Sequence, residues 1–457
     1  IDLRFDHLDA DTVAKAKLRV LDLLGCAIGG VPAYGNAALV NSIAGGGGKP
    51  EASIIGFGVK APVAQAAMAN GVISRSYDFE VMTVVVEGET IPSHHSPTTC
   101  MTALAFGERE HASGKDFLTA LVMADDMAAR LLAASGLDFF QGWDGAPVYS
   151  AIPATAIAAR FLGLDALQTR DPFGLSVDQI AGTVQNIWDG ASNWKLQQGL
   201  VSRNAVLSAE LAKGGWAGLI DPLLAPYGFF AQYTAGCVRP ELLTSHLGKR
   251  FYAEEYFKPY PACAATHASI ECAMALKANY LIDPTKVARI EIFVPEPMLS
   301  VFVSKPFEPR RDPHCNANFS HQFTVANVLV HGSLKQEHYA FDAVRSQPIM
   351  SLVERSELRA LPRGKAGVVI VVTMEDGQAH RKELRGVTSR FPTKHRVTMD
   401  EAVDKFRQQV AFSDYVERSA ADEIIRRVDD LDRETDMADF MHLVTRTVSK
   451  KGVRIVS

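Results

Sequence analysis

The pattern of apolar and polar residues divides the chain into a long helical part, a mixed part and a helical end. In the first part, apolar residues recur at helical spacing, beginning with a stripe from Val13 to Leu24. Alanine-rich stretches of similar character follow at 62–73, 98–111, 115–134, 150–162 and 204–213. Because small side chains let helices approach closely, this part predicts a large packed helical bundle.

The pattern changes near residue 255. Residues 287–294 alternate between apolar and polar, which predicts a half-buried strand. Residues 367–384 predict a hairpin, because two strand-like runs flank the turn sequence Glu-Asp-Gly at 375–377. Helices are expected at 264–279 and 320–332. This part is therefore expected to be an α+β domain.

The end of the chain returns to helical spacing. Thr398 and Glu401 have the spacing of a capping box, and the periodic, charged stretch 420–448 predicts further helix. We expect this tail to rejoin the N-terminal helices. The predicted fold is thus multidomain with α and β structure, and comprises a large all-helical domain, 1–254 with 396–457, and a smaller α+β domain, 255–395.

Composition indicates an ordinary globular protein. The 457 residues favour two to three domains, and 47% hydrophobic with 22% charged residues excludes the composition typical of disorder. The net charge of −5 and the scattered basic residues give no indication of nucleic-acid binding. Six widely spaced cysteines without a CxxC pair predict reduced thiols. With no signal pattern and no apolar run near ~18 residues, we expect a cytoplasmic location and no membrane contact.

The most distinctive segment runs from Lys258 to His267 and has the sequence KPYPACAATH. Its two prolines predict a rigid loop up to about Cys263, followed by a helix whose first turn carries His267. A junction between loop and helix can bind a carboxylate, because loop side chains and free helix N–H groups converge there. The alternative is a turn with an exposed lysine and a packed histidine.

This segment resembles the K-x-x-P-x-C-x-x-x-H stretch of the MmgE/PrpD family, which includes 2-methylcitrate dehydratase, cis-aconitate decarboxylase and iminodisuccinate epimerase. Further similar pieces occur in the same order along the chain, at 21–30, 69–79, 103–108, 193–195 with 203–204, and 317–320. The resemblance implies a helical domain and a lid with the active site between them, a homodimer, no cofactor, and a small di- or tricarboxylate as substrate.

The resemblance also assigns candidate catalytic residues. Asp78 matches the first Asp of the family's Asp-Phe-Asp-Asp motif, and His94 matches the His of its His-Pro-Gly/Ser motif. Lys258 and His267 complete the predicted catalytic set. The interval from Asp78 to His94 is about six residues longer than the resemblance leads us to expect, so 82–92 is predicted to be a loop that contributes to specificity.

The candidate substrate-binding residues are Lys195, His95, Asp144, Arg203, Cys263 and Phe323. Two of them depart from the family pattern, since Asp144 stands where the family has a second active-site His and Phe323 where many members have Tyr. Lys195 is expected just before a helix that starts near Ser202, and its alternative role is that of a surface lysine. For Cys263, a small buried residue is favoured over a nucleophile, because no activating base is evident.

These residues predict proton abstraction next to a carboxylate, with His94 and His267 as base and acid in an order that the sequence leaves open. Dehydration of a hydroxylated di- or tricarboxylate is the first hypothesis. Decarboxylation, epimerisation and a homodimer that has lost its chemistry are the alternatives. Acids and histidines at 77–95 could bind a metal, but no HExxH or H-x-H pattern supports one, so no metal is predicted.

Overall fold

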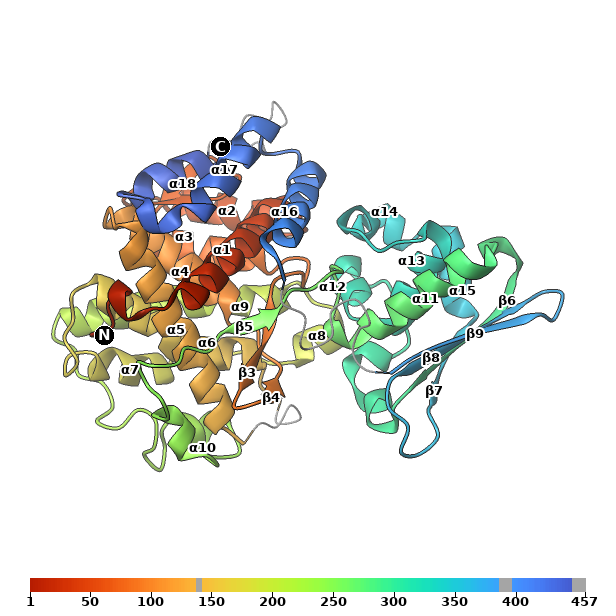
Figure 1. Ribbon diagram of the computed structural model, residues 1–457, viewed down its shortest axis with the longest axis horizontal. Coiled ribbons are helices and arrows are strands. Elements are labelled where there is room, and N and C mark those ends of the chain that lie inside the picture. Colours follow the sequence, from red (N-terminus) through yellow and green to blue (C-terminus); the bar gives the residue numbers. More distant parts are fainter. Residues whose placement is uncertain (137–141, 386–396, 446–457) are drawn as a thin grey trace.

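The computed structural model describes residues 1–136, 142–385 and 397–445. The end of the predicted lid domain and the last residues of the predicted C-terminal helix therefore lie outside the described residues. Figure 1 shows two lobes of unequal size, and the described chain begins and ends in the larger one. The residue boundaries of the two predicted domains stay predictions.

The larger lobe combines helices from both ends of the sequence (Figure 1). Its helices are α1 (Ala10–Gly30), α2 (Asn36–Gly46), α3 (Val63–Ser74), α4 (Ser96–Arg109), α5 (Gly114–Ala134), α6 (Gly145–Phe161), α7 (Arg170–Val177), α8 (Gln185–Asp189), α9 (Asn193–Lys213), α10 (Phe229–Tyr233), α16 (Met399–Ser413), α17 (Arg418–Asp429) and α18 (Met437–Thr445). Leu21, Phe117, Phe406 and Phe440 share one hydrophobic core, so the C-terminal helices pack on the N-terminal ones.

Three helices of this lobe approach one another at glycines. A Cβ atom on Gly30 of α1 would lie 2.0 Å from the carbonyl oxygen of Ile73 in α3. A Cβ atom on Gly199 of α9 would lie 2.3 Å from the carbonyl oxygen of Met68, also in α3. Neither position has room for a larger residue. The C-terminal end of α3 is thereby fixed between α1 and α9, and the candidate site begins at that end.

The prediction of an all-helical first domain is wrong in one respect, because the larger lobe also contains two small sheets. In the first, β1 (Ala52–Ile54) pairs with β2 (Val59–Ala61). In the second, the strand order is β4 (Glu89–Ile91), β3 (Met82–Val86), β5 (Glu254–Tyr256). The segment 82–92, predicted as a loop, is thus a hairpin. Its consecutive valines favour a strand, and Glu87 and Gly88 take the positive φ angles of a tight hairpin turn.

The smaller lobe contains a four-stranded sheet in the order β7 (Ser356–Ala360), β6 (Val287–Val294), β8 (Val368–Met374), β9 (Ala379–Leu384). Only the β6–β7 pair is parallel. The predicted strand at 287–294 and the predicted hairpin are confirmed. The helices of this part are α11 (His267–Tyr280), α12 (Pro313–Asn318), α13 (His321–His331), α14 (Phe341–Val344) and α15 (Gln347–Glu354). Ile290 and Ile370 of the sheet share a core with Leu276 of α11 and Val325 of α13.

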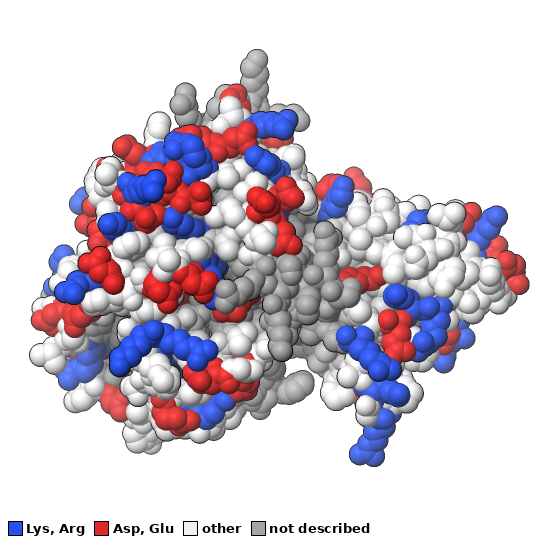
Figure 2. Space-filling view, in the orientation of Figure 1, with Lys and Arg blue, Asp and Glu red and all other residues white. Residues whose placement is uncertain are grey.

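The surface and the helix lengths bear on possible partners. On the face drawn in Figure 2, acidic and basic side chains are intermixed over the larger lobe. Within the described residues, no helix is both long enough and apolar enough to cross a membrane.

Candidate active site

The candidate site is built around a buried turn that follows α3. Asp78 in this turn has a φ angle of +50°, a left-handed conformation that is uncommon for a residue other than glycine. The Nζ atom of Lys258 donates to the backbone oxygen of Asp78 at 2.7 Å and lies 2.8 Å from its Oδ2 atom. Asn318 donates to the backbone oxygens of Tyr77 and Pro261, at 2.9 Å each. Residues distant in sequence therefore hold the turn in its strained conformation.

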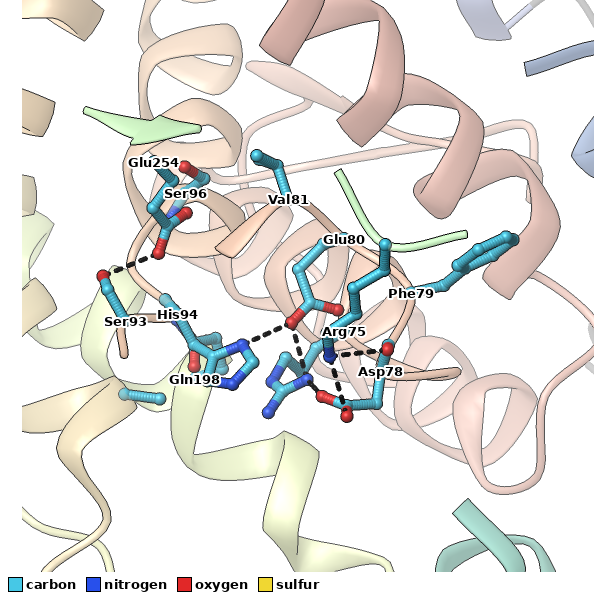
Figure 3. Close-up of polar contacts among 12 residues, drawn as sticks. Arg75, Asp78, Phe79, Glu80, Val81, Ser93, His94, Ser96, Gln198 and Glu254 are labelled. Atoms are coloured by element: carbon cyan, nitrogen blue, oxygen red, sulfur yellow. Dashed lines mark hydrogen bonds and ion pairs between the residues drawn. The ribbon is translucent and has the colours of Figure 1, made fainter. Parts of the chain in front are cut away.

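Five charged or titratable side chains meet at this turn and are called the charge cluster here: Arg75, Asp78, Glu80, His94 and Lys258. Nη1 of Arg75 contacts Oδ1 of Asp78 and lies 2.7 Å from Oε1 of Glu80 (Figure 3). The same Oε1 atom lies 2.8 Å from Nδ1 of His94. The structure thus brings together three of the four predicted catalytic residues, Asp78, His94 and Lys258. It adds Arg75 and Glu80 to them.

The charges in the cluster compensate one another. Burial on its own raises the pKa of the Asp78 carboxyl, but Arg75 and Lys258 outweigh it and hold that pKa well below the ordinary value. The pKa of Glu80 is lowered for the same reasons, against the same effect of burial. Both carboxylates are therefore ionised, and two buried negative charges face two buried positive charges.

Asp78, Glu80 and His94 also have the donor set of a metal site, since one ligand atom from each lies within 4.8 Å of the others. However, Nη1 of Arg75 contacts one oxygen of each carboxylate. Lys258 supplies a second positive charge to Asp78. The guanidinium and the ammonium thus already provide the charge that a metal would bring, and the group is better described as an ion-pair network.

His94 presents one ring nitrogen to the protein and leaves the other open. Its backbone oxygen accepts a hydrogen bond of 2.9 Å from Nε2 of Gln198 on α9, and its Nδ1 atom is on Glu80. The side chain is 24% exposed, in contrast to the fully buried Glu80. Within the part of the chain that the structure describes, no side chain or backbone group bonds to Nε2 of His94. This nitrogen is available to a substrate.

His267, the fourth predicted catalytic residue, is placed differently. Its Nδ1 atom lies 3.0 Å from the hydroxyl of Tyr256, and its Nε2 atom lies 3.1 Å from the backbone oxygen of Ala262. Burial, with a contribution from Lys258, lowers its pKa to about 3, so the ring is neutral. Both nitrogens are engaged, with Nε2 donating to the carbonyl and Nδ1 accepting from the phenol. In this arrangement His267 supports the Lys258 loop and presents no free nitrogen.

Lys195 was expected ahead of a helix starting near Ser202, but α9 begins at Asn193 and includes it. The alternative of a surface lysine is also wrong, since Lys195 is 4% exposed. Its Nζ atom donates to the backbone oxygen of Tyr34 at 2.7 Å, to Oδ1 of Asn36 at 2.9 Å and to Oγ of Ser76 at 3.2 Å. Burial lowers its pKa to about 8. All three bonding partners are neutral, and among the described residues no carboxylate bonds to this ammonium.

Asp144 lies at the N-terminus of α6, where it accepts a hydrogen bond of 2.9 Å from the backbone N–H of Ala146. Its other carboxylate oxygen accepts from Nε2 of Gln197 on α9. Burial raises the pKa of Asp144, while the hydrogen bond from Ala146 and the charges of Arg75 and His94 act to lower it. Gln197 also lines a cavity of about 540 Å³ beside α9. Asp144 is thus joined to this cavity through Gln197, which lines it.

Two predicted substrate-binding residues have other contacts. His95 is buried, with Nδ1 2.7 Å from Oγ of Ser93, and its backbone N–H donates to Glu254 at 2.8 Å. It joins the start of α4 to β5. Arg203 lies two turns beyond Lys195 on α9 and donates to the neighbouring Asn204 at 3.2 Å. Among the contacts of the described residues, neither side chain bonds to the charge cluster, so their roles in binding stay predictions.

The remaining two residues contribute mainly to packing. Desolvation raises the pKa of the Cys263 thiol to about 11, which does not favour an activated nucleophile. The residue is half-buried, whereas a buried one was favoured, and its role in binding stays a prediction. Phe323 is fully buried in the smaller lobe, with its ring centroid 5.3 Å from that of Phe307 and 5.8 Å from that of Tyr339. Its ring therefore belongs to the hydrophobic core.

Sequence reasoning missed three residues of the site. Arg75 stands three residues before Asp78 and stacks on Trp194, with its guanidinium carbon 4.8 Å from the ring centroid. Glu80 was noted as an acid but was given no role. The ring of His314 lies 4.4 Å from that of Tyr77 in the same turn. The sequence feature that could have identified Arg75 is its position at the end of an apolar helix, three residues before Asp78 and five before Glu80.

Comparison with known proteins identifies the family of the chain. The MmgE/PrpD N-terminal domain matches residues 1–239, and the MmgE/PrpD C-terminal domain matches residues 260–432. A cis-aconitate decarboxylase-like protein of Aspergillus oryzae, oryM, is 24% identical, over 97% of this chain and 95% of its own. A cis-aconitate decarboxylase of Aspergillus terreus is 25% identical over 61% of this chain and 59% of its own length. Since the two domain matches span most of the sequence, the chain belongs to the MmgE/PrpD family.

Proposed function

We propose that the protein is a cofactor-independent lyase that removes a proton next to a carboxylate of a hydroxylated di- or tricarboxylate. The observation that carries this proposal is the open Nε2 atom of His94 beside the buried cations Arg75 and Lys258. Removing such a proton places negative charge on the neighbouring carboxylate. Preorganised cations and hydrogen-bond donors stabilise that charge.

Each residue has a distinct task in the proposed reaction. Lys195 binds a substrate carboxylate, because its ammonium bonds to neutral oxygens within the described chain. His94 accepts the Cα proton at Nε2, for which an imidazole is suited near neutral pH. The electron pair of the broken C–H bond forms a C=C bond as the C–O bond to the hydroxyl breaks. Asp144 supplies the proton that lets the hydroxyl leave as water, since burial raises its pKa.

A second candidate is decarboxylation, and the names of the relatives favour it, because they describe cis-aconitate decarboxylases or a protein like them. In that reaction a C–C bond breaks, carbon dioxide leaves, and the electron pair left on carbon takes a proton. The same cations and the same two proton-transfer groups serve both reactions. Reprotonation on the opposite face would give epimerisation.

The residues that form and hold the site come from both lobes. Asp78 and Arg75 belong to the larger lobe, whereas Asn318, which holds their turn, belongs to α12 at the smaller lobe. We propose that the smaller lobe acts as a lid over the site and that the protein forms the homodimer that the family resemblance implies. A cytoplasmic location stays a prediction.

Proton NMR in D2O tests the function. Purified protein is incubated with citrate, 2-methylcitrate, cis-aconitate and succinates that carry a hydroxyl or amino group. New vinylic signals from a hydroxylated substrate indicate dehydration, and loss of a carboxyl group indicates decarboxylation. Deuterium exchange with inversion at the same carbon indicates epimerisation. Silence across the panel from folded protein would contradict the proposal and favour a homodimer that keeps the fold without the chemistry.

A further inference from the structure

Glu80 is a buried carboxylate at the centre of the charge cluster, and the chemistry above gives it no task. It is 0% exposed. Its Oε1 atom lies 2.7 Å from Nη1 of Arg75 and 2.8 Å from Nδ1 of His94, so one oxygen is shared by a cation and an imidazole (Figure 3). Arg75 is held in turn by Asp78 and by the face of Trp194. The position of Glu80 is therefore fixed from several sides.

This geometry determines which nitrogen of His94 carries the proton. An ionised carboxylate can only accept hydrogen bonds. Glu80 is ionised because Arg75 and Lys258 lower its pKa despite burial. In the hydrogen bond between Glu80 and His94, Nδ1 must therefore be the donor. A neutral His94 with its proton on Nδ1 has a lone pair on Nε2, which is the nitrogen that is open to a substrate.

We propose that Glu80 is the positioning residue of His94 and that Arg75 holds Glu80 in place. This orienting triad, Arg75–Glu80–His94, sets the tautomer and the direction of the imidazole, and it stabilises the imidazolium that forms when Nε2 takes a proton. The inference deepens the proposed function and rests on it for the role of His94 as base. The hydrogen-bond assignment itself does not depend on the substrate.

The surroundings of His94 support this assignment. Its backbone oxygen accepts a hydrogen bond of 2.9 Å from Gln198 of α9, which fixes the position of the backbone from which the ring extends to Glu80. The charged groups near the ring are Arg75, Asp78 and Glu80 of the turn, Lys258, and Asp144 at the start of α6. Of these acids, Glu80 is the one within hydrogen-bond distance of the ring.

The test replaces Glu80 by glutamine, which keeps the size and removes the charge. We expect kcat to fall about 10²-fold. This is the typical loss when a residue that orients a histidine or assists a proton transfer is removed. KM should not rise, because Arg75 gains freedom to bind a substrate carboxylate. The acidic limb of the kcat/KM profile should move to lower pH, since a neutral amide no longer stabilises the imidazolium.

The matched control is Glu254→Gln. Glu254 is another buried glutamate of the same region, but it accepts from Ser93 and from the backbone of His95 and Ser96, away from the His94 ring. Its variant should leave the acidic limb in place, even if it lowers stability. Equal losses of kcat in the two variants with an unmoved limb would overturn the proposal, because Glu80 would then be merely structural. An unchanged kcat in Glu80→Gln would overturn it as well.

A second measurement uses the unaltered protein and needs no turnover. Two-bond and three-bond ¹H–¹⁵N correlations of ¹⁵N-histidine-labelled protein report which ring nitrogen is protonated, and the His94→Gln variant assigns the His94 signals. The triad predicts the proton on Nδ1. A proton on Nε2 of the neutral ring would overturn the triad even if the protein proved to be an active lyase, whereas a proton on Nδ1 with no activity would leave the triad standing and reject the proposed function.

Discussion

At the scale of single residues, the site is organised by charge compensation. Arg75 and Lys258 are paired with Asp78 and Glu80, whereas the partners of Lys195 in the described part of the chain are neutral oxygens. Of the cations in the candidate site, the buried ammonium of Lys195 is therefore the best candidate to bind an anion. Removing one partner of a buried pair costs about 3–5 kcal/mol, so the paired cations are expected to matter for folding as well as for catalysis.

The lowered pKa of Lys195, about 8, makes substrate binding depend on pH. Above that pH the amine is neutral, so we expect KM to rise as pH increases through about 8. The folded pKa lies below the ordinary value of 10.5, so the unfolded chain binds more protons between the two values, and stability should rise with pH across that window.

The variant Lys195→Arg checks this, because a guanidinium keeps its charge throughout the range. Its KM should stay flat where that of the unaltered protein rises. Steady-state kinetics between about pH 6 and pH 10 provide the measurement. The same rise of KM in the arginine variant would show that another group is responsible.

Several site residues could be predicted from the sequence, and others could not. Asp78, His94 and Lys258 were identified through the family resemblance, and the structure places them together. His267 was identified too, but its full burial and its bonds to Tyr256 and Ala262 depend on tertiary packing that spacing does not reveal. Arg75 was missed because a single basic residue after a helix usually points to solvent.

At the scale of elements, two helices far apart in sequence hold the turn that carries Asp78 and Glu80. Lys405 of α16 donates to the backbone oxygen of Phe79 at 2.6 Å and lies 2.6 Å from Oδ1 of Asp22 in α1. The other carboxylate oxygen of Asp22 accepts from the N–H of Val81 at 2.8 Å. The C-terminal helices therefore contribute to the site without touching a substrate.

Replacing Lys405 by methionine should destabilise the protein by about 3–5 kcal/mol, because it leaves the carboxylate of Asp22 buried without its cation. The double variant Asp22→Asn with Lys405→Met should recover part of this loss. Urea unfolding followed by circular dichroism gives the free energies. A change below about 0.5 kcal/mol in the single variant would contradict a role for this pair in holding the turn.

The sequence predicted most elements and misplaced those that depend on packing. Thr398 and Glu401 form the predicted capping box at α16. The start of α9 was missed because Ser192 makes no side-chain capping bond, and because Gly199 argued against a continuous helix. Gly199 is required there for close approach to α3, as its distance to Met68 shows. The hairpin of β3 and β4 was missed although its valines and its turn at Glu87 and Gly88 are local signals. The pairing of β3 with β5 is a long-range contact that local spacing does not reveal.

At the scale of the whole molecule, the candidate site combines residues from the larger lobe and from the smaller lobe. Lys258 follows β5, the last strand of the larger lobe, while Asn318 belongs to α12 at the smaller one, and both bind the turn of Asp78 (Figure 1). A ligand that binds these residues would also link the lobes. Ligand binding should therefore stabilise the folded protein as a whole.

An unreactive tricarboxylate such as tricarballylate tests this linkage. At a hundredfold excess over Kd, a ligand that binds only the folded state adds about 2.7 kcal/mol of stability. Differential scanning calorimetry should show a higher unfolding temperature with the ligand. The variant Lys195→Met lacks the ammonium. In this variant, the ligand should raise the unfolding temperature less at the same concentration. An equal increase in both proteins would argue against Lys195 as a ligand for carboxylate.

The most direct test of the proposed chemistry compares deuterium incorporation from D2O into an active carboxylate by the unaltered protein and by His94→Gln. The control is His111→Gln, since His111 is exposed and pairs with Asp436, far along the sequence from the cluster. We predict that the rate of deuterium incorporation falls about 10²–10⁴-fold in His94→Gln and is unchanged in the control. Exchange that continues at the normal rate in folded His94→Gln would contradict the assignment of His94 as the base.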